Sequence, residues 1–288
     1  MKIKKAIMPV AGFGTRFLPA TKAQPKEMLP IVDKPIIQYL VEEAVSAGIE
    51  EIIFVTGRGK RAIEDHFDYS FELEHTLVEK NKIDRLKEIY KLPSLAKYAF
   101  VRQPKPLGDG DAILKARHLI GNEPCAILFG DDIVDFKKPC IAQLMDVFEK
   151  YNDPVVALEK IPMKDVCKFG VIKPNKISER TYEIKDLIEK PSVEEAPSNL
   201  SIVGKYIITS AVFQELEKIK PGKDGEIRLA DALKALLKKK AVYGYEFEGK
   251  RYDCGSKLGF LQATVDFALK HKELNGEFRQ YLKSLDLK

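Results

Sequence analysis

The chain has 288 residues, of which 45% are hydrophobic and 32% are charged, so it can bury a large core and is not a disordered protein. Its net charge of +5 is small and its lysines are dispersed, which favours small anions rather than nucleic acid as ligands. No run approaches the roughly 20 consecutive apolar residues of a membrane span, so we expect a cytoplasmic protein that does not bind membranes.

The first predicted strand leads into a loop with the features of a phosphate-binding site. Residues 6–10 are an apolar run typical of a buried strand, and Gly12 and Gly14 follow it. Glycines at this point let the backbone approach a ligand and turn N–H groups toward bound oxygens. Arg16 adds a planar cation suited to phosphate. Two common alternatives do not fit, because a P-loop requires Gly-Lys-Ser/Thr and a dinucleotide fingerprint requires glycine in place of Phe17.

Strand-like and helix-like segments alternate along the first half of the chain. We expect helices at residues 35–47, 72–91 and 112–119, and strands at 52–56, 98–101 and 126–129. This β-α-β order predicts an α/β fold with a mostly parallel central sheet and helices on both of its faces. After residue 132 short strand-like runs follow one another closely, and from residue 256 the pattern is helical.

Asp131 follows the predicted strand at residues 126–129. The carboxyl ends of strands are where ligands bind open α/β sheets, and Mg²⁺ takes oxygen ligands of this kind. An aspartate in this position also commonly begins a turn. The residues alone leave both interpretations of Asp131 open.

Motifs spread over nearly the whole chain resemble the signature of the sugar-nucleotide pyrophosphorylases. The first two are G-x-G-T-R-x-L-P at residues 12–19 and P-K-E-M-L-P at residues 25–30, and the second is most similar to the bacterial UTP:glucose-1-phosphate uridylyltransferases. The others are V-D-K-P-I-I-Q-Y at 32–39, R-Q at 102–103, K-F-G-V at 168–171, I-E-K-P at 188–191 and R-Y-D-C-G-S at 251–256.

The resemblance implies a Rossmann-like nucleotidyltransferase fold in three regions. Residues 1–132 would form the nucleotide-binding core, and residues 133–255 a sugar-phosphate-binding half with an added β region, continuous with the core. Residues 256–288 would form C-terminal helices, a candidate region for assembly into a homodimer or homotetramer.

The reaction implied by the resemblance converts UTP and α-D-glucose 1-phosphate to UDP-glucose and pyrophosphate. The attacking phosphate oxygen is already largely ionised near neutral pH, because the second pKa of a phosphomonoester is about 6. No general base is required, and catalysis must instead offset the repulsion between two anions. The resemblance therefore implies Mg²⁺ as a cofactor together with a set of Arg and Lys side chains.

The resemblance also assigns roles to individual residues. Arg16 and Lys26 would act on the triphosphate and Lys190 on the sugar phosphate. Asp131 and Asp253 would hold the metal ion, while Asp132 points elsewhere. The nucleotide would be bound by Ala11, Gly12, Gly14, Thr15, Glu27, Gln103 and Gly108. The sugar would be bound by Gly170, Glu189, Lys190 and Tyr206.

Two segments differ from the family pattern. Residues 107–112 read L-G-D-G-D-A where many bacterial members read L-G-L-G-H-A. We expect Asp111 to cap a helix that begins at Ala112, and Asp109 to face solvent. Residues 226–231 read E-I-R-L-A-D in place of the usual E-I-Q-L-T-D, and their place in the site stays open.

Two other functions are alternatives to uridylyl transfer. The first is a dTTP-dependent glucose-1-phosphate thymidylyltransferase, because one methyl group on the base changes binding by only about 1–3 kcal/mol. The second is a non-catalytic regulatory subunit that binds nucleotide sugar. The presence of Arg16, Lys26, Asp131 and Asp253 argues against this second alternative.

Overall fold

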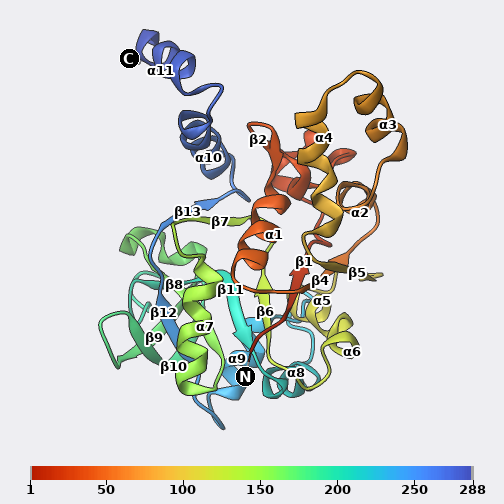
Figure 1. Ribbon diagram of the computed structural model, residues 1–288. Coiled ribbons are helices and arrows are strands. Elements are labelled where there is room, and N and C mark those ends of the chain that lie inside the picture. Colours follow the sequence, from red (N-terminus) through yellow and green to blue (C-terminus); the bar gives the residue numbers. More distant parts are fainter. Residues whose placement is uncertain (1, 287–288) are drawn as a thin grey trace.

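A computed structural model describes residues 2–286 and shows a nine-stranded sheet flanked by helices (Figure 1). Its strands are β1 (Lys5–Pro9), β4 (Glu51–Thr56), β5 (Lys97–Arg102), β6 (Cys125–Leu128), β8 (Val155–Lys160), β9 (Gly170–Lys176), β10 (Thr181–Glu189), β11 (Leu200–Ile208) and β12 (Tyr243–Glu246). Two short ribbons lie outside it, formed by β2 (Pro30–Ile31) with β3 (Lys34–Pro35) and by β7 (Asp132–Asp135) with β13 (Lys250–Asp253).

The strand order of the large sheet is β5-β4-β1-β6-β11-β8-β12-β10-β9. The half from β5 to β6 is parallel, as the alternating strands and helices predict. Beyond β6 the sheet is mainly antiparallel, with β12 and β8 as a parallel pair. The expected α/β fold is confirmed, and the sheet is mixed because β11 pairs antiparallel with both β6 and β8.

The helices are α1 (Ile36–Ser46), α2 (Arg61–His66), α3 (Phe71–Glu79), α4 (Ile83–Tyr90), α5 (Asp109–Lys115), α6 (Arg117–Ile120), α7 (Cys140–Tyr151), α8 (Ser210–Leu216), α9 (Leu229–Leu236), α10 (Lys257–Lys270) and α11 (Asn275–Ser284). They form one hydrophobic core on each face of the sheet. Apolar residues of α1 and α7 pack with Ala6 and Met8 of β1, whereas those of α5, α8 and α9 pack with Ile7. Successive residues of β1 thus point to opposite faces, as strand geometry requires.

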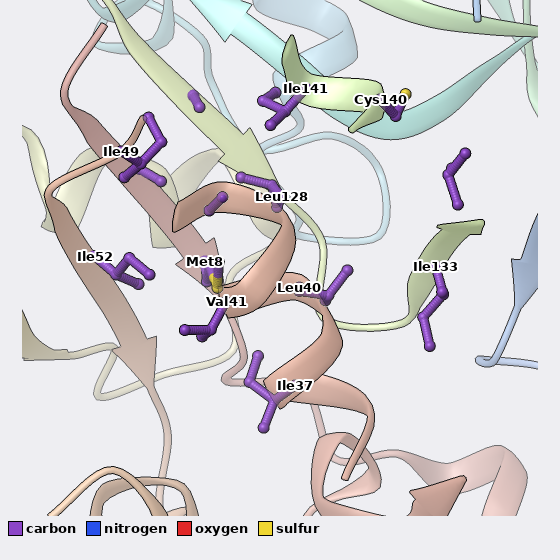
Figure 2. Close-up of a cluster of buried hydrophobic side chains, with 14 of the residues drawn as sticks. Met8, Ile37, Leu40, Val41, Ile49, Ile52, Leu128, Ile133, Cys140 and Ile141 are labelled. Carbon is purple, nitrogen blue, oxygen red and sulfur yellow. The ribbon is translucent and has the colours of Figure 1, made fainter. Parts of the chain in front are cut away.

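Helix α1 contributes to the first core because its apolar residues recur at helical spacing and five of them, Ile36, Ile37, Leu40, Val41 and Ala44, are buried. Figure 2 shows Leu40 and Val41 of this helix beside Met8 of β1 and Leu128 of β6. The helix ends before Gly48, whose φ of 93° lies in the left-handed region that favours glycine. This packing holds β1 and β6 side by side, and both strands end at the candidate site.

Two predicted helices differ from those observed. The single helix expected at residues 72–91 is divided into α3 and α4, because Asn81 adopts a φ of 51° and ends the first helix. The helix expected at residues 112–119 begins earlier, at Asp109, and divides into α5 and α6. The helical C-terminal segment is confirmed, and the Ser256 side chain caps α10 by accepting a hydrogen bond from Gly259 N at 3.1 Å.

Helices α10 and α11 extend away from the sheet (Figure 1, blue). Their exposed faces carry large apolar side chains, among them Leu258, Leu261 and Tyr281. Among residues 2–286, no helix combines the length and the apolar character needed to cross a bilayer.

Candidate active site

A cavity of about 420 Å³ opens at the carboxyl ends of β1 and β6. Its size is that of a site for a small organic ligand, and its position is where open α/β sheets bind ligands. Its wall contains all seven residues predicted to bind nucleotide, together with one predicted catalytic lysine and one predicted metal ligand. These residues are Ala11, Gly12, Gly14, Thr15, Lys26, Glu27, Gln103, Gly108 and Asp131.

The glycine loop is tied to the segment that carries Lys26. Gly14 has a φ of 67°, and a Cβ atom at this position would lie 3.0 Å from Lys26 Cβ. Thr21 Oγ1 donates a hydrogen bond to Gly14 O at 2.8 Å, a contact that the sequence motifs did not reveal. A side chain at position 14 would therefore strain the backbone and push the two segments apart. Arg16 Nη1 reaches Gly255 O at 3.4 Å across a neighbouring cavity of about 250 Å³.

Lys26 and Asp131 form an ion pair in the wall of the cavity, with 2.5 Å between Lys26 Nζ and Asp131 Oδ2. Burial opposes the charge on Lys26, but the attraction of the Asp131 and Glu27 carboxylates outweighs burial and raises the pKa of Lys26. Burial also opposes the charge on Asp131, but the attraction of Lys26 outweighs burial and lowers the pKa of Asp131. Both groups are thus charged near neutral pH, as a site for polyphosphate and a cation requires.

Glu27 pairs with Lys60, which the sequence analysis did not identify. Lys60 Nζ donates to Glu27 Oε2 at 2.7 Å, and the two side chains are only 5% and 1% exposed. Burial raises the pKa of Glu27 and lowers that of Lys60, and their mutual attraction opposes both shifts. Within residues 2–286, Glu27 Oε1 is buried without a hydrogen-bond partner, so it remains available as an acceptor.

Asp131 and Asp253 both lie close to Gly255. A Cβ atom at Gly255 would collide with the Asp131 carboxylate and lie 3.1 Å from Asp253 Oδ1. Burial and the neighbouring carboxylates of Asp132 and Asp131 raise the pKa of Asp253. Two carboxylates at one point are the number and kind of protein ligands that Mg²⁺ commonly takes, and a cation would offset their repulsion. These residues therefore fit a magnesium ion.

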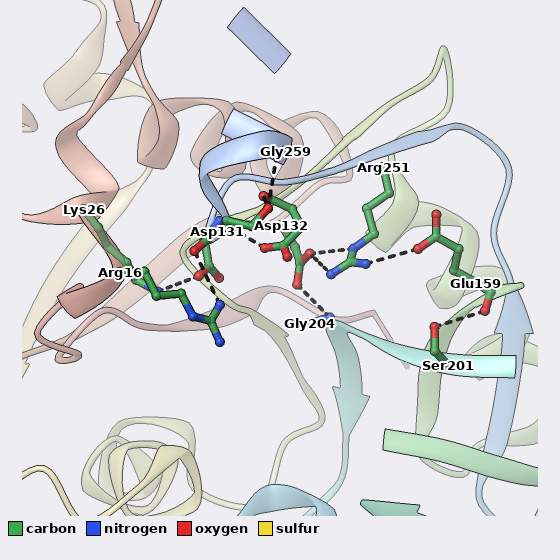
Figure 3. Close-up of polar contacts among 12 residues, drawn as sticks. Arg16, Lys26, Asp131, Asp132, Glu159, Ser201, Gly204, Arg251 and Gly259 are labelled. Carbon is green, nitrogen blue, oxygen red and sulfur yellow. Dashed lines mark hydrogen bonds and ion pairs between the residues drawn. The ribbon is translucent and has the colours of Figure 1, made fainter. Parts of the chain in front are cut away.

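Asp132 belongs to a separate network, as predicted. It accepts hydrogen bonds from Gly204 N at 3.1 Å and from Arg251 Nε at 2.6 Å (Figure 3). Arg251 Nη1 also contacts Glu159 Oε2 at 3.1 Å. Burial opposes the guanidinium charge, but the two carboxylates outweigh it and raise the pKa of Arg251. The network joins β7, β11 and β13. Asp131 directly precedes β7 and Asp253 is the last residue of β13, so the network helps to fix the backbone that carries both carboxylates.

The four predicted sugar-binding residues lie on the antiparallel half of the sheet. Gly170 pairs with Glu189 in the register of β9 and β10, and a Cβ at Gly170 would lie 2.9 Å from Glu189 Oε2. Lys190 follows with a φ of 49°, its Nζ 3.7 Å from Glu189 Oε1. Tyr206 packs against Phe129, which lines the large cavity, with ring centroids 5.6 Å apart. Among the described residues, the wall of that cavity contains none of the four, so they form an adjacent group.

Both expectations for the acidic residues of the 107–112 loop are wrong. Asp109 does not face solvent; it accepts a hydrogen bond from Leu229 N, at the start of α9, at 2.8 Å. Asp111 does not cap a helix, because α5 begins three residues earlier than predicted and its N-cap, Gly108, makes no side-chain hydrogen bond. Asp111 instead accepts a hydrogen bond from Gln103 Nε2 at 2.8 Å.

The segment at residues 107–110, which leads into α5, is paired with the 226–231 segment. Ile227 N donates to Leu107 O at 2.8 Å, and Gly110 N donates to Ile227 O at 2.9 Å. A Cβ at Gly108 would lie 2.9 Å from Ile227 N, and the φ of Gly108 is 97°. Glu226 lines the large cavity, so this segment belongs to the site wall.

The position of Asp109 predicts a pH effect on stability. Burial raises its pKa from 3.8 to about 6, against the lowering effect of hydrogen bonds from Leu229 and Gly110. The folded state therefore binds the Asp109 proton more tightly than the unfolded state does. This proton contributes its full stabilisation of the fold below pH 3.8, and the contribution is lost as the pH rises through about 6. Asp109→Asn, which stays neutral, is expected to be more stable than wild type at pH 8 by about 1 kcal/mol.

Thermal or urea unfolding of both proteins at pH 5 and pH 8 measures this difference. The advantage of Asp109→Asn should be smaller at pH 5, which lies between 3.8 and about 6, than at pH 8. A matched substitution at the exposed Asp84, Asp84→Asn, should show no such change with pH. A difference between wild type and Asp109→Asn that is equal at both pH values contradicts the assignment.

The chain is similar to known proteins along nearly its whole length. The model of the nucleotidyl transferase family matches residues 5–269. The chain is 50% identical over 284 residues to a UTP–glucose-1-phosphate uridylyltransferase of Bacillus subtilis, covering 99% of this chain and 97% of the relative. A UTP-bound UDP-glucose pyrophosphorylase from Acinetobacter baumannii has a similar structure, with 40% identity, a TM-score of 0.92, and coverage of 99% of this chain and 100% of that one. A UDP-glucose pyrophosphorylase complexed with UDP-glucose has 46% identity and a TM-score of 0.85, covering 94% and 100% of the two chains.

Proposed function

The chain belongs to the nucleotidyl transferase family, and from this premise we infer that it transfers a uridylyl group from UTP to α-D-glucose 1-phosphate. The products are UDP-glucose and pyrophosphate. One observation carries the proposal: a single cavity gathers the two-glycine loop, Lys26, Gln103 and Asp131 at the carboxyl edge of the sheet. Relatives that are named for this reaction are 50% and 51% identical to the chain and align with 99% of it.

In the proposed reaction, an oxygen of the sugar phosphate attacks the α-phosphorus of UTP in line with the departing pyrophosphate. That oxygen is already ionised near neutral pH, so the protein need not remove a proton. The work of the site is to hold two anions together and to stabilise charge on the leaving group. Lys26, whose pKa is raised, remains a cation throughout and lies in the cavity wall.

We assign the two sets of cations to different substrates. Arg16 and Lys26 lie next to the glycine loop and would bind the triphosphate. Lys190 lies at the end of β10 beside Glu189, and would bind the phosphate of the sugar while Glu189 accepts hydrogen bonds from its hydroxyls. Tyr206 is held protonated, because burial and nearby carboxylates raise its pKa, so it would contribute a hydroxyl or an apolar wall.

We propose Mg²⁺ as the cofactor, held by Asp131 and Asp253. When bound, it would neutralise charge on the phosphates. The carboxylate of Asp131 would then be shared between the ion and Lys26, whose Nζ is 2.5 Å away in the structure. The network of Arg251 with Asp132 would keep Asp131 in position.

Removal of the Lys190 side chain tests the division between the two substrates. Lys190→Ala is expected to raise the KM for glucose 1-phosphate by about tenfold or more, the scale of one lost charged hydrogen bond. The affinity for UTP, measured alone by calorimetry, should change little. Lys164→Ala, which removes an exposed lysine elsewhere, should leave both values unchanged. Loss of UTP binding in Lys190→Ala would show that the assignment is reversed.

Initial rates of pyrophosphate release with each nucleoside triphosphate and glucose 1-phosphate test the proposed function. UTP should give the highest kcat/KM. A higher value with dTTP would identify the thymidylyltransferase instead. Absence of turnover with every nucleotide, together with measurable binding of UDP-glucose, would support the non-catalytic alternative.

We further propose the three-region organisation, with a nucleotide-binding core at 1–132, a sugar-phosphate-binding half at 133–255 and C-terminal helices from 256. We also propose that the protein forms a homodimer or homotetramer through α10 and α11. The exposed apolar side chains of Leu258, Leu261 and Tyr281 support this assembly, because such surfaces are commonly buried between subunits. Light scattering on the purified protein measures the subunit number.

A further inference from the structure

The side-chain amide of Gln103 has both of its hydrogens occupied by the protein. Gln103 Nε2 donates to Gly108 O at 3.0 Å and to Asp111 Oδ2 at 2.8 Å. A carbonyl oxygen and a carboxylate can only accept hydrogen bonds, so the amide nitrogen must be the atom that faces them. Rotation of the amide by half a turn would place its oxygen against these two acceptors. The orientation of Gln103 is therefore fixed chemically.

Asp111 does not line the cavity, whereas Gln103 does. The Asp111 side chain is held in α5, where its Oδ1 lies 3.2 Å from Lys115 Nζ one turn further along. Asp111 and Gln103 are only 5% and 6% exposed, so little solvent competes for their contact. The Asp111 side chain is thus linked to the cavity wall by its hydrogen bond from Gln103.

The fixed amide leaves Gln103 Oε1 as a hydrogen-bond acceptor. Within residues 2–286, no group donates a hydrogen bond to this oxygen. An acceptor in the cavity wall matches a base that carries a hydrogen on ring nitrogen 3, as uracil and thymine do. Cytosine has a lone pair on the same nitrogen, so it would repel the oxygen.

We propose that Asp111 is a positioning residue for the nucleobase: it holds the Gln103 amide so that the site accepts a base with an N3–H group and rejects cytosine. This inference rests on the proposed function, because it assumes that the base of the nucleotide lies beside Gln103. It concerns the choice between UTP and CTP, and predicts no effect on the choice between UTP and dTTP.

The substitution Asp111→Asn tests the proposal at nearly constant side-chain volume. An asparagine can donate as well as accept, so one of the two obligatory acceptors that hold the Gln103 nitrogen is lost and only Gly108 O still opposes rotation of the amide. The amide can then turn its nitrogen toward the cavity more readily than in the wild-type protein. The ratio of kcat/KM for UTP to kcat/KM for CTP is expected to fall about tenfold, the scale of one buried hydrogen bond. Asp111→Ser, which also removes the obligatory acceptor, provides a second variant if Asp111→Asn unfolds. The control is Lys115→Met, which removes the other partner of Asp111 and should leave the ratio unchanged.

A double-mutant cycle tests whether Asp111 acts through Gln103. In a Gln103→Ala background, Asp111→Asn should no longer alter the ratio of UTP to CTP use. An unchanged ratio in folded Asp111→Asn, or an equal change in the Gln103→Ala background, overturns the inference. Failure of the wild-type protein to use UTP would instead overturn the proposed function, so the two failures are distinguishable.

Discussion

Replacement of Lys26 by alanine is expected to lower kcat/KM for UTP by about 10² to 10³, the loss typical of one preorganised electrostatic contact. Lys26 packs against Gly14 of the glycine loop and pairs with Asp131 in the cavity wall. Its removal takes a positive charge from the triphosphate and leaves the partly buried Asp131 carboxylate without its partner. Steady-state kinetics with varied UTP measure the effect.

The matched control is Lys22→Ala, which removes an exposed lysine from the same segment and should retain wild-type kinetics. A thermal melt of Lys26→Ala separates loss of catalysis from loss of fold. If the variant is folded and its kcat/KM for UTP stays within threefold of wild type, Lys26 has no part in the reaction.

Replacement of Asp131 by asparagine is expected to lower kcat by about 10² or more. The variant keeps the shape of the side chain but removes the negative charge of the carboxylate, which pairs with Lys26 and which we propose as a ligand of Mg²⁺. Excess EDTA should abolish activity of the wild-type protein, and added Mg²⁺ should restore it. The variant should need a higher Mg²⁺ concentration for half-maximal rate.

Asp135 offers a control in the same region, because it ends β7 and pairs with Lys270 rather than facing the cavity. Asp135→Asn should keep the wild-type Mg²⁺ dependence. Full turnover of the wild-type protein in excess EDTA would contradict the metal assignment for both Asp131 and Asp253.

The parts of the site that lie within neighbouring motifs could be predicted from the sequence. Gly12 and Gly14 belong to the motif at residues 12–19 and Lys26 to the next one at 25–30, and a glycine loop after a strand is typical of phosphate binding. The position of Asp131 followed from its place after β6, since strand ends define the ligand-binding edge of such sheets. The parallel half of the sheet was predictable for the same reason, because each strand alternates with a helix.

The contacts between distant segments could not be predicted. Asp109 binds Leu229 N, 120 positions away, and Glu27 pairs with Lys60 from another part of the chain. The neighbouring sequence does not distinguish an aspartate that caps its own helix from one that binds the start of a distant helix. In both cases the carboxylate accepts a hydrogen bond from a free N–H group at a helix N-terminus. The break at Asn81 was missed because helical periodicity continues across it, while one left-handed residue suffices to end a helix.

The fate of each phosphate of UTP tests the central claim most directly. The purified protein would be incubated with glucose 1-phosphate and UTP labelled either at the α-phosphate or at the γ-phosphate, and the products separated. Attack at the α-phosphorus predicts that the α label appears in UDP-glucose and the γ label in pyrophosphate, in equal amounts. Appearance of the γ label in a sugar phosphate, or of neither label in a product, would contradict the account.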